Sequence, residues 1–315
     1  MPDVRLSDPP APAVPRPAAA SSPGRGQVGA VALVVGGIFS QQFGSAVANL
    51  LFDRVGAPGV VTLRLTVSAM VLLALCRPAL RGHRRGDWAV VVAFGVALGG
   101  MNLLFYQALA RIPLGTAVTL EVLGPLVLSV VAARRASSWL WAALALAGVV
   151  LLGRGDAGGG DLAGAAFALG AGAMWAAYIL LASRAGSRFP KADGLALAMA
   201  VGALLSLPAG TVGAGSALLN PVALALGAAV ALLSSVLPYT LELMSLRRLP
   251  AGTFAVLMSL APAVAALAGR LVLGQDLGAR ETLAILLVVA ASAGAVRASV
   301  RSPLPGQSAG GSVLL

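Results

Sequence analysis

A single carboxylic acid stands in an apolar stretch where acids are rare. Glu121 lies in "TLEVLGP" and is the one charged residue between Arg111 and Arg134. If this stretch spans a membrane, a charged carboxylate near its centre costs about 2.5–3.5 kcal/mol on insertion scales. Something must offset that cost. Such an acid is a candidate proton carrier, or a partner for the ammonium group of a substrate.

An arginine offers a structural alternative for the same acid. Arg64 lies in another apolar stretch, and both residues are about 8–10 Å from the outer ends of their predicted helices at 1.5 Å per residue. Matching depths make a fixed ion pair between Arg64 and Glu121 one explanation. Arg64 as the ligand of a substrate carboxylate is the other. The two are compatible if the substrate competes for the pair.

Amides and hydroxyls are concentrated in the stretch "SQQFGSAVAN". At helical spacing Gln41, Ser45 and Asn49 fall on one side, with Gln42 close by. Such groups are costly to expose to lipid, so they either line a polar cavity or form hydrogen bonds between helices. We favour the cavity. Further candidates for its lining, whose aromatic members more often serve packing or interface anchoring, are Asn102, Tyr106, Gln107, Trp175 and Tyr178.

The sequence gives little support for a disulfide, a metal site, a nucleotide-binding loop or a catalytic site. The single cysteine, Cys76, excludes an internal disulfide, and the single histidine, His83, lies in the loop-like "RGHRRGD". The glycine-rich "GRGDAGGGD" lacks the Lys-Ser/Thr of a phosphate-binding loop. No HExxH, no acids at metal-binding spacing and no nucleophile elbow occur. We therefore expect no catalytic residue, no metal and no cofactor.

Repeated apolar blocks must position the polar residues. The 315 residues are 58% apolar and 10% charged, whereas soluble proteins carry about 25% charged residues. Blocks of about 17–25 residues span a bilayer as helices, while barrel strands alternate over about ten. We predict an all-α integral membrane protein with ten transmembrane helices. The predicted spans are 28–50, 57–76, 88–110, 116–133, 137–153, 162–183, 194–214, 221–246, 252–273 and 282–298.

The basic residues predict the orientation of these spans. The net charge of +11 is spread over short clusters between apolar blocks, which indicates the positive-inside rule rather than nucleic-acid binding. With the N-terminus inside, sixteen Lys and Arg fall in cytoplasmic segments and four in outer loops. Both termini are thus predicted to be cytoplasmic. Residues 1–26 and 299–315, rich in Pro, Ala, Ser and Gly, are predicted to be disordered cytoplasmic tails without a signal peptide.

An internal repeat divides the chain. "RIPLGTAVTLEVLGP" (111–125) and "RLPAGTFAVLMSLAP" (248–262) align without gaps, and Arg, Pro, Gly, Thr and the final Pro coincide. We predict two five-helix repeats, 27–153 and 154–298. They must be inverted because five is odd. Inverted repeats are common in secondary transporters, which bind substrate near the midplane between the halves.

Differences and matches within the repeat both indicate a site. Met258 takes the place of Glu121, so the acid occurs in one half, whereas a purely architectural need would be expected in both. Pro125 and Pro262 coincide, and each removes a backbone donor within a predicted span. Interrupted helices are tolerated at membrane depth where protein or a water-filled cavity satisfies the freed carbonyls. A binding cavity and a simple packing kink are the two explanations of these helix breaks.

Two stretches resemble a known family. "SQQFGSAVANLLFDRVGAPGVVTLRL" (40–65) and "MNLLFYQALARIPLGTAVTLEVLGPL" (101–126) are similar to the threonine/homoserine exporter branch of the EamA-type, drug/metabolite transporter superfamily. The second half resembles only the general superfamily pattern. The resemblance implies two inverted five-helix repeats, a cytoplasmic-membrane location and secondary export of amino acids or related metabolites. It also implies that Gln41, Arg64, Tyr106 and Glu121 line or support the transport route.

One motif departs from the superfamily. Its fourth and ninth spans often end in a Leu-Gly-Glu turn, where this chain has "AARRAS" and "LGQD". A role assigned to that acid is therefore not carried over.

The expected function is secondary active export of small amino acids such as threonine or homoserine, or of related metabolites. We expect coupling to protons by alternating access. The partners are then a small-molecule substrate and the lipid bilayer, without nucleic acid, and a homodimer is neither required nor excluded. The alternatives are a multidrug or toxic-compound exporter and, from another class, a membrane enzyme or a non-transporting assembly component.

Overall fold

The computed structural model describes residues 25–133, 136–152, 161–190, 192–246 and 251–300. The predicted disordered tails therefore lie almost entirely outside the described residues, as does Arg248 of the repeat. The tails were predicted to end at residue 26 and to begin again at residue 299. In the structure, the first helix begins at Arg25 and the last helix ends at Val300, so each helix extends two residues into a predicted tail.

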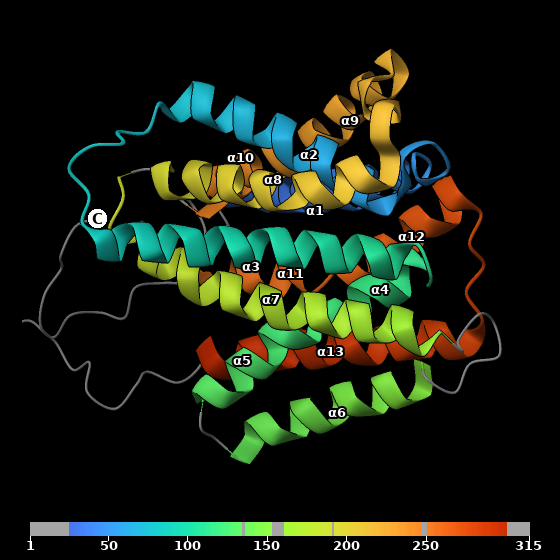
Figure 1. Ribbon diagram of the computed structural model, residues 1–315. Helices are drawn as coiled ribbons and strands as arrows, with labels where there is room; N and C mark the ends of the chain where they lie inside the picture. The colour runs from blue at the N-terminus through green and yellow to red at the C-terminus, as the bar shows by residue number, and fades with distance from the viewer. Residues whose placement is uncertain (1–24, 134–135, 153–160, 191, 247–250, 301–315) are drawn as a thin grey trace, which may run out of the picture.

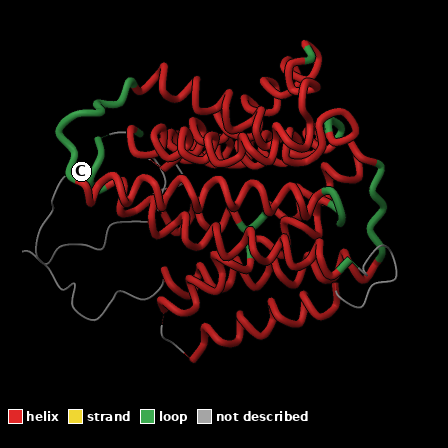
Figure 2. The backbone as a smooth tube through the Cα atoms, in the orientation of Figure 1, coloured by secondary structure: helices red, strands yellow, loops and turns green. Residues whose placement is uncertain are grey.

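The described residues are almost entirely helical and contain no strand (Figure 2). In chain order the helices are α1 (Arg25–Asn49), α2 (Phe52–Cys76), α3 (Arg85–Leu109), α4 (Leu114–Glu121), α5 (Leu123–Ala133), α6 (Ala136–Leu152), α7 (Leu162–Gly186), α8 (Asp193–Ala214), the 3-10 helix η1 (Gly215–Leu219), α9 (Pro221–Ala231), the π-helix η2 (Leu232–Val236), α10 (Leu237–Leu246), α11 (Ala251–Met258), α12 (Ala261–Leu273) and α13 (Ala279–Val300).

The length and composition of the helices confirm the all-α membrane class. Within the described residues, six segments are long and apolar enough to cross a bilayer. They are Val28–Asn49, Phe52–Cys76, Arg85–Leu109, Leu162–Gly186, Asp193–Leu219 and Val256–Leu273. Leu114–Leu128, Trp139–Leu151 and Pro221–Val236 are shorter apolar helical segments.

The helices form a layered bundle (Figure 1). Helices α2 and α8 pack together on one side, α3 and α7 run side by side through the middle, and α6 packs on α13 at the opposite edge. Helix α1 packs against α10 and α12. Segments from distant parts of the sequence thus meet around the centre of the bundle, where the main apolar core lies.

Three of the apolar segments are interrupted. Helix α4 ends at Glu121 and α5 begins at Leu123, two residues before Pro125. Because proline has no backbone N–H, position 125 cannot donate the regular helical hydrogen bond to the Glu121 carbonyl. Helix α11 ends at Met258 and α12 begins at Ala261, just before Pro262. The third interruption, η2, precedes Pro238 and was not predicted from the sequence.

Glycines allow backbones to meet at the first of these breaks. A Cβ atom added to Gly124 would collide with the carbonyl of Gly172 on α7, and one added to Gly172 would contact the carbonyl of Glu121. The break that carries Glu121 therefore packs directly on the α7 backbone. In α2, Gly56 has a positive φ of 66°, which glycine adopts without strain. The predicted span begins directly after this irregular turn, at residue 57, whereas α2 begins at Phe52.

Candidate functional site

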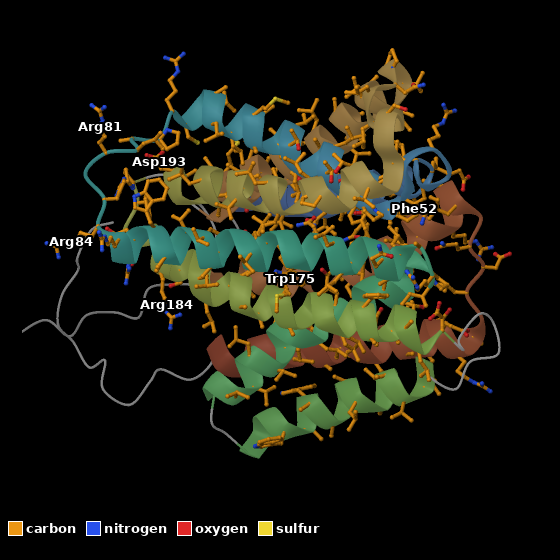
Figure 3. The ribbon with its side chains drawn as sticks, viewed as in Figure 1. Phe52, Arg81, Arg84, Trp175, Arg184 and Asp193 are labelled. Carbon is orange, nitrogen blue, oxygen red and sulfur yellow. The ribbon has the colours of Figure 1, made fainter. Side chains whose placement is uncertain are left out.

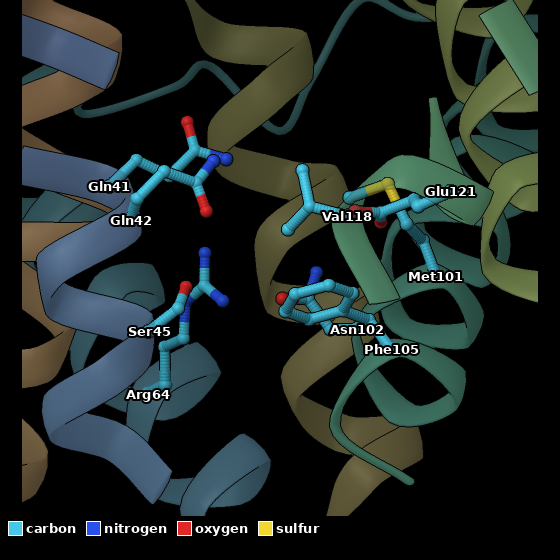
Figure 4. Close-up of a pocket in the computed structure, with 9 residues that line it drawn as sticks. All are labelled: Gln41, Gln42, Ser45, Arg64, Met101, Asn102, Phe105, Val118 and Glu121. Atoms are coloured by element: carbon cyan, nitrogen blue, oxygen red, sulfur yellow. The ribbon is translucent and has the colours of Figure 1, made fainter. Parts of the chain in front are cut away.

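A small polar cavity lies between the first four helices (Figure 4). Helix α1 contributes one polar wall, α2 contributes an arginine, and α3 and α4 form the facing wall. Its lining residues are Gln41, Gln42, Ser45, Arg64, Met101, Asn102, Phe105, Val118 and Glu121. Six of these were candidates from the sequence, so helix packing brings together groups that are up to 80 residues apart in the chain.

Arg64 lines this cavity while being almost completely buried, at 6% exposure. Its Nε donates to the Ser235 hydroxyl oxygen at 3.1 Å, its Nη1 to the Tyr106 hydroxyl oxygen at 3.1 Å, and its Nη2 to the Ser234 carbonyl oxygen at 2.9 Å. The guanidinium carbon also lies 5.5 Å from the centre of the Tyr106 ring. All of these partners are uncharged, so they orient the guanidinium without neutralising it.

The fixed Arg64–Glu121 ion pair, one of the two explanations left open by the sequence, is not formed in this structure. Arg111 and Asp161 lie 4.0 Å apart and Arg188 and Asp87 3.4 Å apart, whereas Arg64 and Glu121 are not within ion-pair distance. Arg64 donates to hydroxyl and carbonyl oxygens instead, although its predicted depth in the membrane matches that of Glu121. The two residues face the same cavity from opposite sides, which Figure 4 shows.

Glu121 occupies an electrostatically demanding position. It is the last residue of α4, and the C-terminal end of a helix carries partial negative charge that disfavours a carboxylate. Among the cavity-lining residues, Arg64 is the basic one and Glu121 the acidic one. A ligand that brings its own ammonium group would relieve this unfavourable position.

The amides differ in how they are satisfied. Asn102 donates from Nδ2 to the Leu98 carbonyl oxygen at 2.8 Å, within its own helix. Gln42 is only 4% exposed, and its Oε1 has no hydrogen-bond partner. An unpaired buried amide oxygen costs free energy unless a ligand or water completes it. Gln42 therefore lines the cavity with a side-chain oxygen that accepts no hydrogen bond.

Five further candidates do not line the cavity. Tyr106 contacts it indirectly, through Arg64. Asn49 donates to the Leu109 carbonyl oxygen, and Gln107 accepts from Arg111, both away from the cavity. The Tyr178 ring packs at a tilted angle against Phe94, and Trp175 packs against the main core. The structure therefore places Asn49, Gln107, Trp175 and Tyr178 outside the lining.

Sequence reasoning missed two sets of neighbours. Met101, Phe105 and Val118 are ordinary apolar residues, and nothing in their types distinguishes a cavity wall from a core position. Ser234 and Ser235, which hold Arg64, carried a readable signal in "LLSSVLP". In that stretch, two adjacent serines precede Pro238 by three and four residues inside an apolar segment.

The cavity is too small for an amino acid. Its volume, counted as the space open to the centre of a water molecule, is about 30 Å³. One water needs about 10–15 Å³ on that measure, so the cavity has room for two or three waters. At least one lining helix must therefore move before a larger solute can bind between Arg64 and Glu121.

Comparisons with known proteins agree on a transporter. Residues 162–297 match the EamA-like transporter family. The chain is 43% identical over 266 residues to the threonine/homoserine exporter RhtA of Salmonella typhimurium, covering 84% of this chain and 90% of that one. It is also 43% identical over 257 residues to the exporter of the same name from Escherichia coli, covering 81% and 87%.

The fold has a solved counterpart. One crystal structure matches with a TM-score of 0.59 over 87% of this chain and 98% of its own. The sequence identity is 22%, so this match concerns the fold alone.

Proposed function

Because the chain belongs to the EamA-like transporter family, as its 43% identity to exporters over most of its length shows, we propose that it exports threonine, homoserine or similar small amino acids across the cytoplasmic membrane. Its relatives are exporters and not enzymes, which leaves the alternative of a membrane enzyme without support. Transport is driven by a gradient, and protons are the coupling ion that Glu121 would serve.

One observation carries the choice of substrate class. Arg64 and Glu121 face one small cavity from opposite sides and are not paired with each other. An amino acid at neutral pH carries a carboxylate and an ammonium group. In the proposed complex, Arg64 binds the carboxylate by charge-assisted hydrogen bonds and Glu121 binds the ammonium group. The cavity amides, Gln41, Gln42 and Asn102, then face the rest of the solute.

The architecture that would move this cavity is the pair of inverted repeats. We place ten spans in two halves, 27–153 and 154–298, with both termini in the cytoplasm. Helix breaks at matching places, before Pro125 in one half and before Pro262 in the other, support this division. Since the cavity is too small for an amino acid, alternating access requires the halves to move so that it opens to each side in turn.

The arginines support the proposed orientation. Arg81, Arg84 and Arg184 project from the same end of the bundle, whereas Phe52 lies near the opposite end (Figure 3). Basic residues mark the cytoplasmic ends of membrane helices. Neither a homodimer nor nucleic acid is needed in this proposal, because one chain supplies the complete cavity lining.

A multidrug exporter is the second candidate within transport. Two charged residues and three amides make this cavity a poor match for lipophilic compounds, whose transfer would leave the polar groups unpaired. The carboxylate and ammonium groups of an amino acid can form hydrogen bonds with these polar side chains.

Uptake by proteoliposomes tests the proposal. Purified protein is reconstituted, and the accumulation of labelled threonine, homoserine and a lipophilic cationic dye is measured with and without an imposed pH gradient. We expect gradient-driven accumulation of both amino acids and none of the dye. Accumulation of the dye alone would establish the multidrug function instead.

A further inference from the structure

The π-helix η2 sits where the second half of the chain meets Arg64. It covers Leu232–Val236 and is followed by Pro238 in α10. A proline has no backbone N–H, and its ring crowds the carbonyl four residues earlier, so Pro238 removes the regular helical partner of the Ser234 carbonyl. The wider turn accommodates this, with the Leu237 N–H donating to the Leu232 carbonyl oxygen.

The freed carbonyls of η2 are satisfied by the first half of the chain. The Ser234 carbonyl oxygen accepts from Arg64 Nη2 at 2.9 Å, and the Leu233 carbonyl oxygen accepts from the Ser40 hydroxyl at 2.7 Å. Gly44 allows this approach, since a Cβ atom there would collide with the Ser234 side chain. Interrupted helices at membrane depth are tolerated where neighbouring protein groups satisfy the backbone in this way.

Ser235 adds the next contact from the same turn. Its side chain is 1% exposed, and its hydroxyl oxygen accepts from Arg64 Nε at 3.1 Å. Two of the three hydrogen bonds of the guanidinium therefore end on η2, and the third ends on Tyr106. A planar guanidinium held at Nε, Nη1 and Nη2 has a fixed orientation.

From these contacts we infer that η2 is a positioning device for Arg64, and that Ser235 and the Pro238-freed carbonyl of Ser234 orient the guanidinium toward the substrate carboxylate. Neutral acceptors suit this task. A carboxylate partner from the protein would neutralise the charge, whereas a hydroxyl and a carbonyl hold it and leave it available for an anion. This inference rests on the proposed function, in which Arg64 binds the carboxylate.

The chain offers a matched pair of variants. Ser235→Ala removes a hydrogen bond between η2 and Arg64. Ser40→Ala removes a hydrogen bond to the adjacent η2 carbonyl and does not touch Arg64 or line the cavity. Both lose one hydroxyl contact to the same turn, so an effect on folding alone should appear in both.

The experiment is threonine uptake by proteoliposomes, with threoninol, which has the same amino and hydroxyl groups but no carboxylate, as a competitor. We expect Ser235→Ala to raise the KM for threonine about three- to tenfold, the size of one ordinary net hydrogen bond, because the effect reaches the substrate only through the orientation of Arg64, with little change in maximal rate. Inhibition by threoninol should be unchanged. Ser40→Ala should keep the parent KM, and Ser235→Thr, which restores the hydroxyl, should recover much of the loss.

A second variant protects the test against a folding defect. Pro238→Ala restores a backbone donor for the Ser234 carbonyl and so competes with Arg64 Nη2, while Ser235 stays in place. It should raise the KM for threonine in the same direction. Equal KM values for parent, Ser235→Ala and Pro238→Ala would overturn the inference while leaving the exporter intact. A parent protein that moves no amino acid would overturn the proposed function and this inference together.

Discussion

At the scale of single residues, the central feature is a basic and an acidic side chain that line one cavity without forming an ion pair. Buried charges are costly and are usually paired. Here Arg64 is held by three neutral acceptors, and Glu121 ends a helix across the cavity. In the proposed function, a zwitterionic solute supplies a charged partner for each of these two side chains. Substrate binding and electrostatic relief are then the same event.

The unpaired oxygen of Gln42 leads to a prediction about side-chain selectivity. Threonine carries a hydroxyl donor, and valine has nearly the same shape without one. A site with an unused buried acceptor favours the solute that pairs with it. In Gln42→Leu, we expect the preference for threonine over valine, measured as the ratio of kcat/KM in liposome uptake, to fall about five- to tenfold, as the loss of one neutral hydrogen bond implies.

Valine uptake by the same variant is the internal control, because valine makes no such hydrogen bond. Its rate should be retained or improved. If threonine and valine lose activity equally, Gln42 supports the fold of the cavity and does not select the substrate.

At the scale of elements, the α4–α5 break depends on a backbone contact with α7. Gly124 and Gly172 meet without side chains between them. We expect Gly124→Ala to force α5 and α7 apart and to destabilise the protein by about 2 kcal/mol or more, because overpacking at rigid backbone costs 1–3 kcal/mol or above. The measurement is the thermal unfolding midpoint of the purified protein in detergent.

Gly213→Ala is the matched control for that change. Gly213 lies in α8, has no neighbouring atom within 4 Å of an added Cβ, and is exposed. Alanine should be neutral or slightly stabilising there, since it favours helix over glycine. A midpoint for Gly124→Ala equal to that of Gly213→Ala would show that the close approach of α5 and α7 is unimportant.

Apolar periodicity and block length were enough to predict the helices, because a bilayer demands about 20 apolar residues per span. Each predicted span overlaps a helical segment of the structure, and ends differ by several residues at α2, where Gly56 breaks the regular turn. The π-helix was not predicted, because its geometry depends on how Ser40 and Arg64 satisfy its carbonyls. That is a tertiary effect.

The site was predictable in part for a similar reason. Polar residues in apolar spans are rare enough to be noticed, and Gln41, Gln42, Ser45, Arg64, Asn102 and Glu121 do meet at one cavity. Which face of each helix turns inward is decided by packing, so Asn49, Gln107, Trp175 and Tyr178 were grouped with them although they lie elsewhere. The Arg64–Glu121 pairing failed because depth alone does not fix side-chain partners.

At the scale of the whole molecule, the charge distribution predicts that the α2–α3 loop faces the cytoplasm and η1 faces outward. Cys76 is the sole cysteine of the chain, so Cys76→Ser gives a background for labelling. In that background we expect Ser216→Cys to react with a membrane-impermeant maleimide added to intact cells. Gly82→Cys should react only after the membrane is permeabilised. Both positions are exposed in the structure. The reverse pattern would contradict the proposed orientation.

The most direct test of the account is the role of Glu121 in coupling. Labelled threonine uptake into proteoliposomes is measured with and without an imposed pH gradient, for the parent and for Glu121→Gln, which keeps the size of the side chain and removes its charge. The account predicts gradient-driven accumulation in the parent and only gradient-independent exchange, if any, in the variant. Accumulation by Glu121→Gln equal to that of the parent would contradict it, and the acid in "TLEVLGP" would then be a structural residue.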